Sequence, residues 1–171
     1  MPRLVFPLGL AVAIFTALSA CDTAADNGLP WHQVSHDVCW SRFQWDAGSQ
    51  SDVWMLPGSA CQDCHGEGGG ARVFTASGTA YMPPHQADGC FGRPDLLIQI
   101  TDANGVIYET TTNEAGNFWF EPAIAPIALP YRVSVFKDGV ETPMRGEVMD
   151  GDCNRCHTQN GADSATGRIT P

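Results

Sequence analysis

The stretch DLLIQITDANGVIYETTTNEAGNFWFE, residues 95–121, carries the clearest fold signal in this 171-residue chain. Two runs rich in β-branched residues are separated by ANG at 103–105, and an Asn-Gly pair between such runs is typical of a β-hairpin. A second turn signal, NEAG, precedes the aromatic run FWF at 118–120. The stretch therefore predicts short strands joined by tight turns.

The same pattern continues on both sides of this stretch. ARVFTASGTAYM at 71–82 and YRVSVFKDGVETPM at 131–144 alternate apolar with polar or small residues. No long segment has the 3.6-residue period of a helix, so an all-helical fold is disfavoured. Five or six short strands predict a mainly β fold: a small antiparallel sandwich of Greek-key type, flanked by two short cysteine motifs and preceded by an irregular N-terminal region.

The succession SGTAY, LLIQITDANGVIYETTTNEAGNFWF and PYRVSVFKDG resembles the carboxypeptidase regulatory-like, transthyretin-like sandwich domain. Thr112, Gly116 and Phe118 match its central element, while Ala80 stands where its first strand has valine. The resemblance covers residues 71–145, about half of the chain after the leader. Because such domains are usually non-catalytic, it implies a scaffold, and the flanking cysteine motifs depart from the family's pattern.

Two segments, CQDCHGEGG at 61–69 and CNRCHTQNG at 153–161, share the pattern Cys-x-x-Cys-His. On one helical turn, positions i, i+3 and i+4 face the same way, so two thiols can meet the vinyl groups of a haem while the histidine reaches the iron. This pattern is the attachment signature of c-type haem. It predicts two covalent haem c groups, attached through Cys61, Cys64, Cys153 and Cys156, with His65 and His157 as proximal iron ligands.

Two other chemistries remain open for these thiols. Four cysteines in two pairs could bind zinc, although the pairs lie much farther apart than in a compact zinc ribbon. Zinc also leaves the histidine after each pair unexplained. Each pair could instead close a small disulfide loop. Haem is the favoured interpretation.

The N-terminus predicts export and lipid anchoring. Arg3 precedes an apolar run that is short for a membrane span, and LSAC at 18–21 resembles the lipobox of bacterial lipoproteins. The resemblance implies cleavage before Cys21 and acylation of that residue, which places the protein on the periplasmic side of the cell envelope, at the inner or outer membrane. The expected regions are a signal peptide (1–20), a tether with a Trp-rich segment (21–60), the first motif (61–70), the sandwich (71–145), and the second motif with the tail (146–171).

The seven cysteines and the charge add two expectations. With Cys21 acylated and four thiols on haem, Cys39 and Cys90 remain as a possible disulfide, and no thiol is left over in an oxidising compartment. Without the leader the chain carries eight Lys and Arg against nineteen Asp and Glu, a formal charge of about −11. No basic stripe suits nucleic acid, so the acidic surface favours a basic redox partner or another cytochrome.

Each iron also needs a second axial ligand or an open site. Candidates are His32, His36, His85, Met55, Met82, Met144 and Met149. His85, made rigid by two preceding prolines, is favoured, followed by Met144 and Met149. Arg168 could pair with a haem propionate, but a solvated tail residue is the preferred interpretation.

The sequence thus predicts a membrane-anchored dihaem c-type cytochrome that exchanges single electrons with a redox partner protein, rather than an enzyme. Two alternatives come from other classes. A haem with an open distal face could reduce a small oxidant, although no acid–base constellation stands out. A non-redox lipoprotein could use the sandwich to bind a partner and the cysteine pairs to hold zinc.

Overall fold

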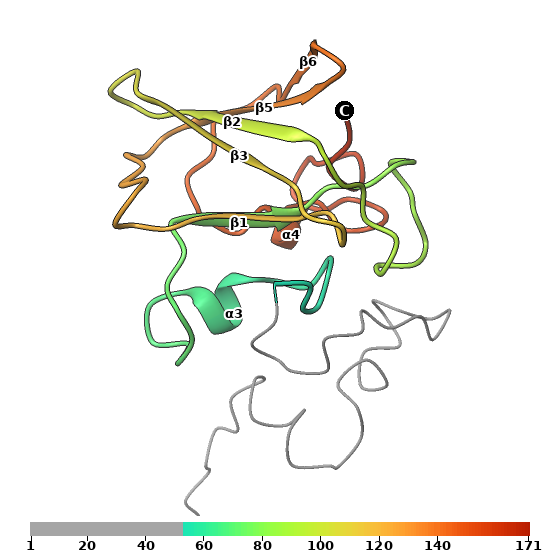
Figure 1. Ribbon diagram of the computed structural model, residues 1–171, viewed down its shortest axis with the longest axis horizontal. Coiled ribbons are helices and arrows are strands. Elements are labelled where there is room, and N and C mark those ends of the chain that lie inside the picture. The colour runs from blue at the N-terminus through green and yellow to red at the C-terminus, as the bar shows by residue number, and fades with distance from the viewer. Residues whose placement is uncertain (1–52) are drawn as a thin grey trace, which may run out of the picture.

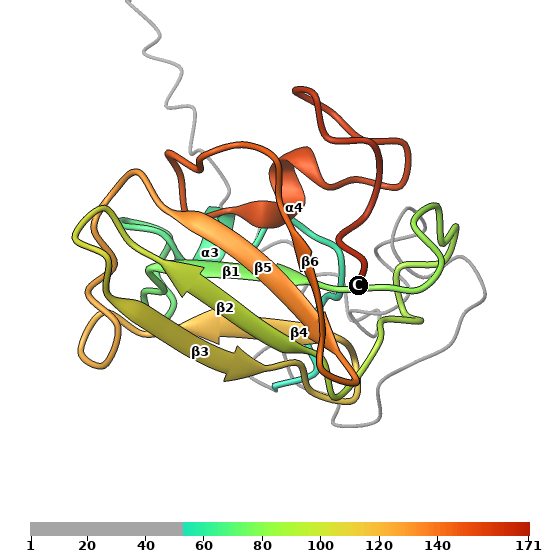
Figure 2. The same ribbon diagram turned by 90° about the horizontal axis from the view of Figure 1, so that it is seen from above.

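The computed structural model describes residues 53–171, which form six antiparallel strands in two sheets (Figures 1 and 2). The mainly β, antiparallel prediction is confirmed. One sheet has the order β1-β4 and the other β3-β2-β5-β6. No helix within the described range is long and apolar enough to span a bilayer. The elements are α3 (Gln62–His65), β1 (Ala76–Thr79), β2 (Leu97–Thr101), β3 (Ile107–Thr111), β4 (Asn117–Phe120), β5 (Arg132–Lys137), β6 (Val140–Pro143) and α4 (Cys153–Cys156).

The hydrophobic core lies between the two sheets. Along β2 every second side chain is buried, so Ile98 and Ile100 face inward while their neighbours are partly exposed. Phe118 and Phe120 of β4 belong to the same buried cluster from the opposite sheet. This two-residue period is what alternating apolar residues impose on a strand with one face covered. The edge strands β3 and β6 are largely exposed.

Turn chemistry fixes the register of the strands. The hairpin predicted at 103–105 forms between β2 and β3, with Thr101 opposite Ile107. The Gly105 N–H donates to Asp102 O at 2.9 Å, and Gly105 has a φ of +78° that favours glycine. At the next turn Gly116 has a φ of +81°, and a Cβ there would lie 2.5 Å from Ala80 O. Any larger residue at position 116 would therefore displace the backbone beside β1.

The segment after residue 145 packs against the sheets. Tyr131 and Val148 exchange two backbone hydrogen bonds, and the Tyr81 N–H donates to Ile169 O at 2.8 Å. The expectation that Arg168 is a solvated tail residue is wrong. Its guanidinium carbon lies 4.2 Å from the Tyr81 ring centroid, and the residue is 6% exposed. A guanidinium is attracted to the face of an aromatic ring. The Arg168 Nε also donates to Gln86 O at 2.9 Å.

The core predicts a contrast between two isoleucines. Ile98→Ala should lower the free energy of unfolding by about 2–5 kcal/mol, because it leaves a cavity between the sheets. Ile124→Ala, at a side chain that is 78% exposed, should change it by no more than about 0.5 kcal/mol. Urea denaturation of both variants measures the difference. Equal destabilisation would contradict this placement of the core.

Candidate functional site

Each Cys-x-x-Cys-His segment forms a single helical turn. The His65 N–H donates to Cys61 O at 2.9 Å, and the His157 N–H donates to Cys153 O at 3.0 Å. These are helical i to i+4 bonds, so the first cysteine and the histidine of each motif lie on one face of the turn. Both motifs therefore contain a helical turn, as their residue spacing predicts.

The two motifs lie side by side, although they are far apart in sequence. The Gln62 N–H at the start of α3 donates to Asp152 Oδ2, just before α4, at 3.1 Å across 90 positions. Asn154 Nδ2 lies 3.6 Å from Cys61 Sγ. Figure 1 shows the two-stranded sheet between α3 and the four-stranded sheet. The tertiary structure thus brings the two motifs into contact.

The Asn154 side chain holds the second motif on β1. Its Oδ1 accepts from the Thr79 N–H at 2.9 Å, and its Nδ2 donates to Ser59 O at 2.8 Å. Asn154 is only 3% exposed, so these bonds replace contacts with water. Gly78 permits this close approach, because a Cβ there would lie 2.9 Å from the Cys153 Cβ. A buried amide and a missing side chain therefore bring α4 against the strand.

Both motif histidines are oriented by backbone carbonyls. His65 Nδ1 lies 2.7 Å from Arg72 O, and His157 Nδ1 lies 2.8 Å from Gly167 O. Because a carbonyl only accepts, Nδ1 must carry the hydrogen in each ring. In the neutral imidazole this leaves the lone pair on Nε2. Metal-ligating histidines are commonly held by such a second bond, which fixes the tautomer and the ring orientation.

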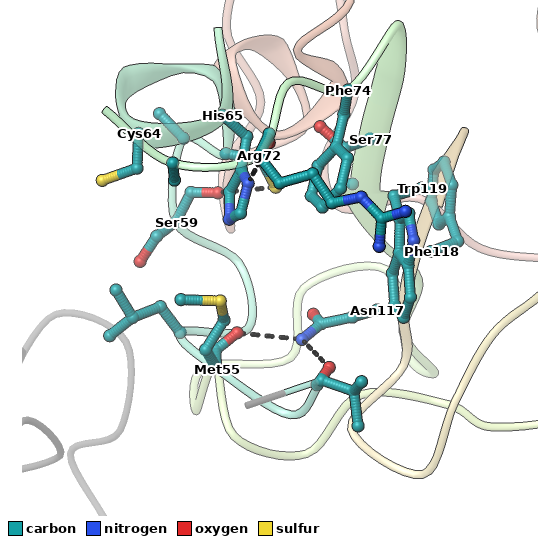
Figure 3. Close-up of a pocket in the computed structure, with 16 residues that line it drawn as sticks. Met55, Ser59, Cys64, His65, Arg72, Phe74, Ser77, Asn117, Phe118 and Trp119 are labelled. Carbon is teal, nitrogen blue, oxygen red and sulfur yellow. Dashed lines mark hydrogen bonds between the residues drawn. The ribbon is translucent and has the colours of Figure 1, made fainter. Parts of the chain in front are cut away.

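A cavity of about 570 Å³ opens beside the first motif. Its volume lies within the range of about 300–1,000 Å³ that is usual for small-molecule and cofactor sites. Figure 3 shows His65 on one side of this space and Met55 on the other. The residues that line it include Met55, Cys61, Cys64, His65, Phe74, Asn117, Phe118 and Trp119.

Aromatic rings support the first histidine. The Phe74 ring stacks on His65 with centroids 4.1 Å apart and planes inclined by 12°. Trp119 continues the stack at 5.8 Å from Phe74. Arg72, which orients His65 through its carbonyl, lines the cavity and forms a salt bridge with Glu121. The cavity thus combines an apolar wall with a charged side chain, as is usual for small-molecule sites.

Burial keeps two of the motif thiols protonated. It raises the pKa of Cys61 to about 12, and the charge of Asp152 adds to the effect. Burial likewise raises the pKa of Cys153 to about 12, with contributions from Cys61 and Asp152. Asp152 itself has a raised pKa because of desolvation, and its Oδ1 is buried without a partner among the described residues. A neutral thiol is a weak nucleophile, so these two sulfurs are unreactive in the folded chain.

The remaining cysteines are in different states. Cys64 and Cys90 each belong to a disulfide, whereas Cys156 is a free thiol. A sulfur in a disulfide cannot form a thioether at the same time, so haem attachment at Cys64 requires that bond to be reduced. Cys39, the expected partner of Cys90, lies outside the described residues, as does Cys21.

The structure separates the candidate distal ligands. His85 Nδ1 lies 2.9 Å from Gln159 O, which places His85 against the loop that follows the second motif. Met144 and Met149 are exposed, and neither lines the cavity. His32 and His36 lie outside the described residues. Met55, which had no distinguishing sequence feature, does line the cavity.

Within residues 53–171 no three His, Cys, Asp or Glu side chains converge into a group that could hold a metal ion by themselves. The four motif thiols therefore do not converge into such a group within these residues. A haem places a smaller demand on the protein, because its porphyrin supplies four of the iron's ligands. One or two axial side chains complete the coordination.

Removal of the Asn154 amide should loosen the second motif. Asn154→Ala leaves the buried Thr79 N–H without its acceptor, so the free energy of unfolding should fall by about 1–3 kcal/mol. The exposed Asn160 provides a matched control, and Asn160→Ala should fall within about 0.5 kcal/mol of wild type. Chemical denaturation tests both. An Asn154→Ala variant as stable as the control would contradict this role.

Thiol reactivity in the haem-free chain offers a second test. A shift in pKa from 9.0 to about 12 lowers the thiolate fraction near pH 8 by roughly a thousandfold. Cys61 and Cys153 should therefore react with iodoacetamide far more slowly in the folded chain than in urea. Peptide mapping by mass spectrometry gives the rate at each cysteine. Equal rates in the two states would show that these thiols are not buried.

No family model, curated protein or solved structure matches this chain.

Proposed function

We propose that this protein is a dihaem c-type cytochrome that passes single electrons in the bacterial cell envelope, anchored to a membrane through acylated Cys21. The observation that carries the proposal is the shared geometry of the motifs. In each, the first cysteine and the histidine share one face of a helical turn, and a carbonyl holds the imidazole with Nε2 free to ligate.

The residues fit covalent haem by the chemistry of their donors. Cys61 and Cys64 would attach the first haem and Cys153 and Cys156 the second, while His65 and His157 would each ligate one iron. His85 lies beside the second motif's loop and is the favoured distal ligand there. When bound, the iron supplies a one-electron change between its ferric and ferrous states. The protein's part is to orient the imidazoles, exclude water and hold the two sites together.

The contact between the motifs supports transfer from one haem to the other within the molecule. Asn154 and Gln62 join α3 to α4, so the groups attached there would be neighbours. The strands would serve as a rigid scaffold, a Greek-key sandwich of the carboxypeptidase regulatory-like type. The formal charge of about −11 favours a basic redox partner or a basic patch on another cytochrome.

Haem content tests this proposal directly. The chain, produced in a host with c-type cytochrome maturation, should carry two haems by the pyridine haemochrome assay. Cys61→Ser/Cys64→Ser and Cys153→Ser/Cys156→Ser should each leave one haem, because thioether bonds need the motif thiols. His85→Ala, outside both motifs, should keep both haems attached. Stoichiometric zinc with no Soret band in the matured wild type would overturn the proposal.

A further inference from the structure

Met55 Sδ, we propose, is the second axial ligand of the iron attached at Cys61 and Cys64, opposite His65. This inference rests on the proposed function and assigns a residue that sequence features did not favour. Figure 3 shows the Met55 sulfur directed into the cavity on the side facing the His65 ring. Both residues line the same space of about 570 Å³. A thioether is one of the established axial ligands of haem iron.

The backbone at Met55 is fixed to the strands that form the cavity. Asn117 Nδ2 of β4 donates to Met55 O at 2.9 Å, and Asn117 Oδ1 accepts from Thr79 Oγ1 at 2.8 Å. Thr79 Oγ1 also accepts from the Gly58 N–H at 2.8 Å. Because Asn117 and Thr79 are buried, these bonds are shielded from water. Met55 therefore has a defined position relative to the first motif.

The turn that follows Met55 is conformationally constrained. Leu56 has a φ of +38° and Gly58 a φ of +78°. The left-handed region is unfavourable for leucine, so it persists only where the surrounding contacts impose it. A Cβ at Gly58 would also lie 2.4 Å from Tyr81 Oη. The chain is thus held in an unusual turn at the point where it enters the cavity wall.

The second motif has a different surrounding. His85 is the side chain positioned near it, through the bond from Nδ1 to Gln159 O. His/Met ligation raises the reduction potential of a haem relative to His/His ligation. The two haems would then be inequivalent, with the first at the higher potential. An electron that entered at the second haem would reduce it. Transfer to the first haem would then reoxidise the second and reduce the first.

Met55→Leu and Met55→His test the assignment in the matured dihaem protein. Met55→Leu removes the sulfur with little change in volume, so the near-infrared band of the iron–methionine bond should disappear and carbon monoxide should bind the reduced first haem. Met55→His should keep that iron six-coordinate and shift its midpoint potential downward. Met144→Leu and Met149→Leu, at exposed methionines outside the cavity, should retain the band and the wild-type potential.

The haem count separates this inference from the function on which it rests. Two haems per chain in every variant, with the band unchanged in Met55→Leu, would overturn the assignment of Met55 and leave the cytochrome proposal intact. A wild-type protein with two haems and only the spectrum of bis-histidine ligation would overturn it as well. Loss of the band in Met55→Leu alone, with far-ultraviolet circular dichroism as in wild type, is the expected result.

Discussion

The backbone N–H of Thr79 is buried at the end of β1, and it must find an acceptor inside the protein. That acceptor is Asn154 Oδ1, in the middle of the second cysteine motif. An unpaired buried N–H would cost about 1–3 kcal/mol, so the pairing fixes where α4 can lie. The same amide group donates to Ser59 O, just before the first motif. This asparagine side chain thus helps to hold together two motifs that are far apart in sequence.

The structure around the motifs combines apolar and charged side chains. Phe74, Phe118 and Trp119 supply an apolar wall, which excludes water and strengthens any charge interaction inside it. Asp152 places a carboxylate between the motifs, where desolvation raises its pKa. If the proposed haems are attached, a negative charge at that position would favour the oxidised, more positive form of a neighbouring iron. The reduction potentials of the proposed protein would then depend on this carboxylate as well as on the axial ligands.

Local features of this fold were predictable from the sequence, and long-range ones were not. The ANG turn and the alternation around Ile98 depend on neighbouring residues, and both have the expected structure. The helical turn of each cysteine motif likewise follows from spacing alone. The contact between Asn154 and Thr79 depends on how the sheets pack, which no local pattern encodes. Arg168 shows the same limit, because its partner Tyr81 comes from a distant segment.

The candidate second axial ligands show why the tertiary features of the site could not be predicted from the sequence. Two prolines before His85 suggested a rigid ligand, and His85 does lie near the second motif's loop. No sequence feature distinguishes Met55, because its proposed assignment rests on the contact with Asn117 and on the cavity, which are both tertiary features. Met149 lies close to the second motif in sequence, and neither Met144 nor Met149 lines the cavity beside the first motif.

The closing segment of the fold has a consequence for biogenesis. The Ile169 carbonyl and the Arg168 N–H pair with the backbone of Tyr81 and Pro84, so the segment that follows β1 gains these neighbours only after the residues beyond the second motif have been synthesised. Cys61 and Cys153 are buried in the complete fold. In the proposed dihaem protein, attachment at these two sulfurs would therefore have to precede this packing step. Haem attachment in the proposed protein would then compete in time with the packing of the C-terminal residues.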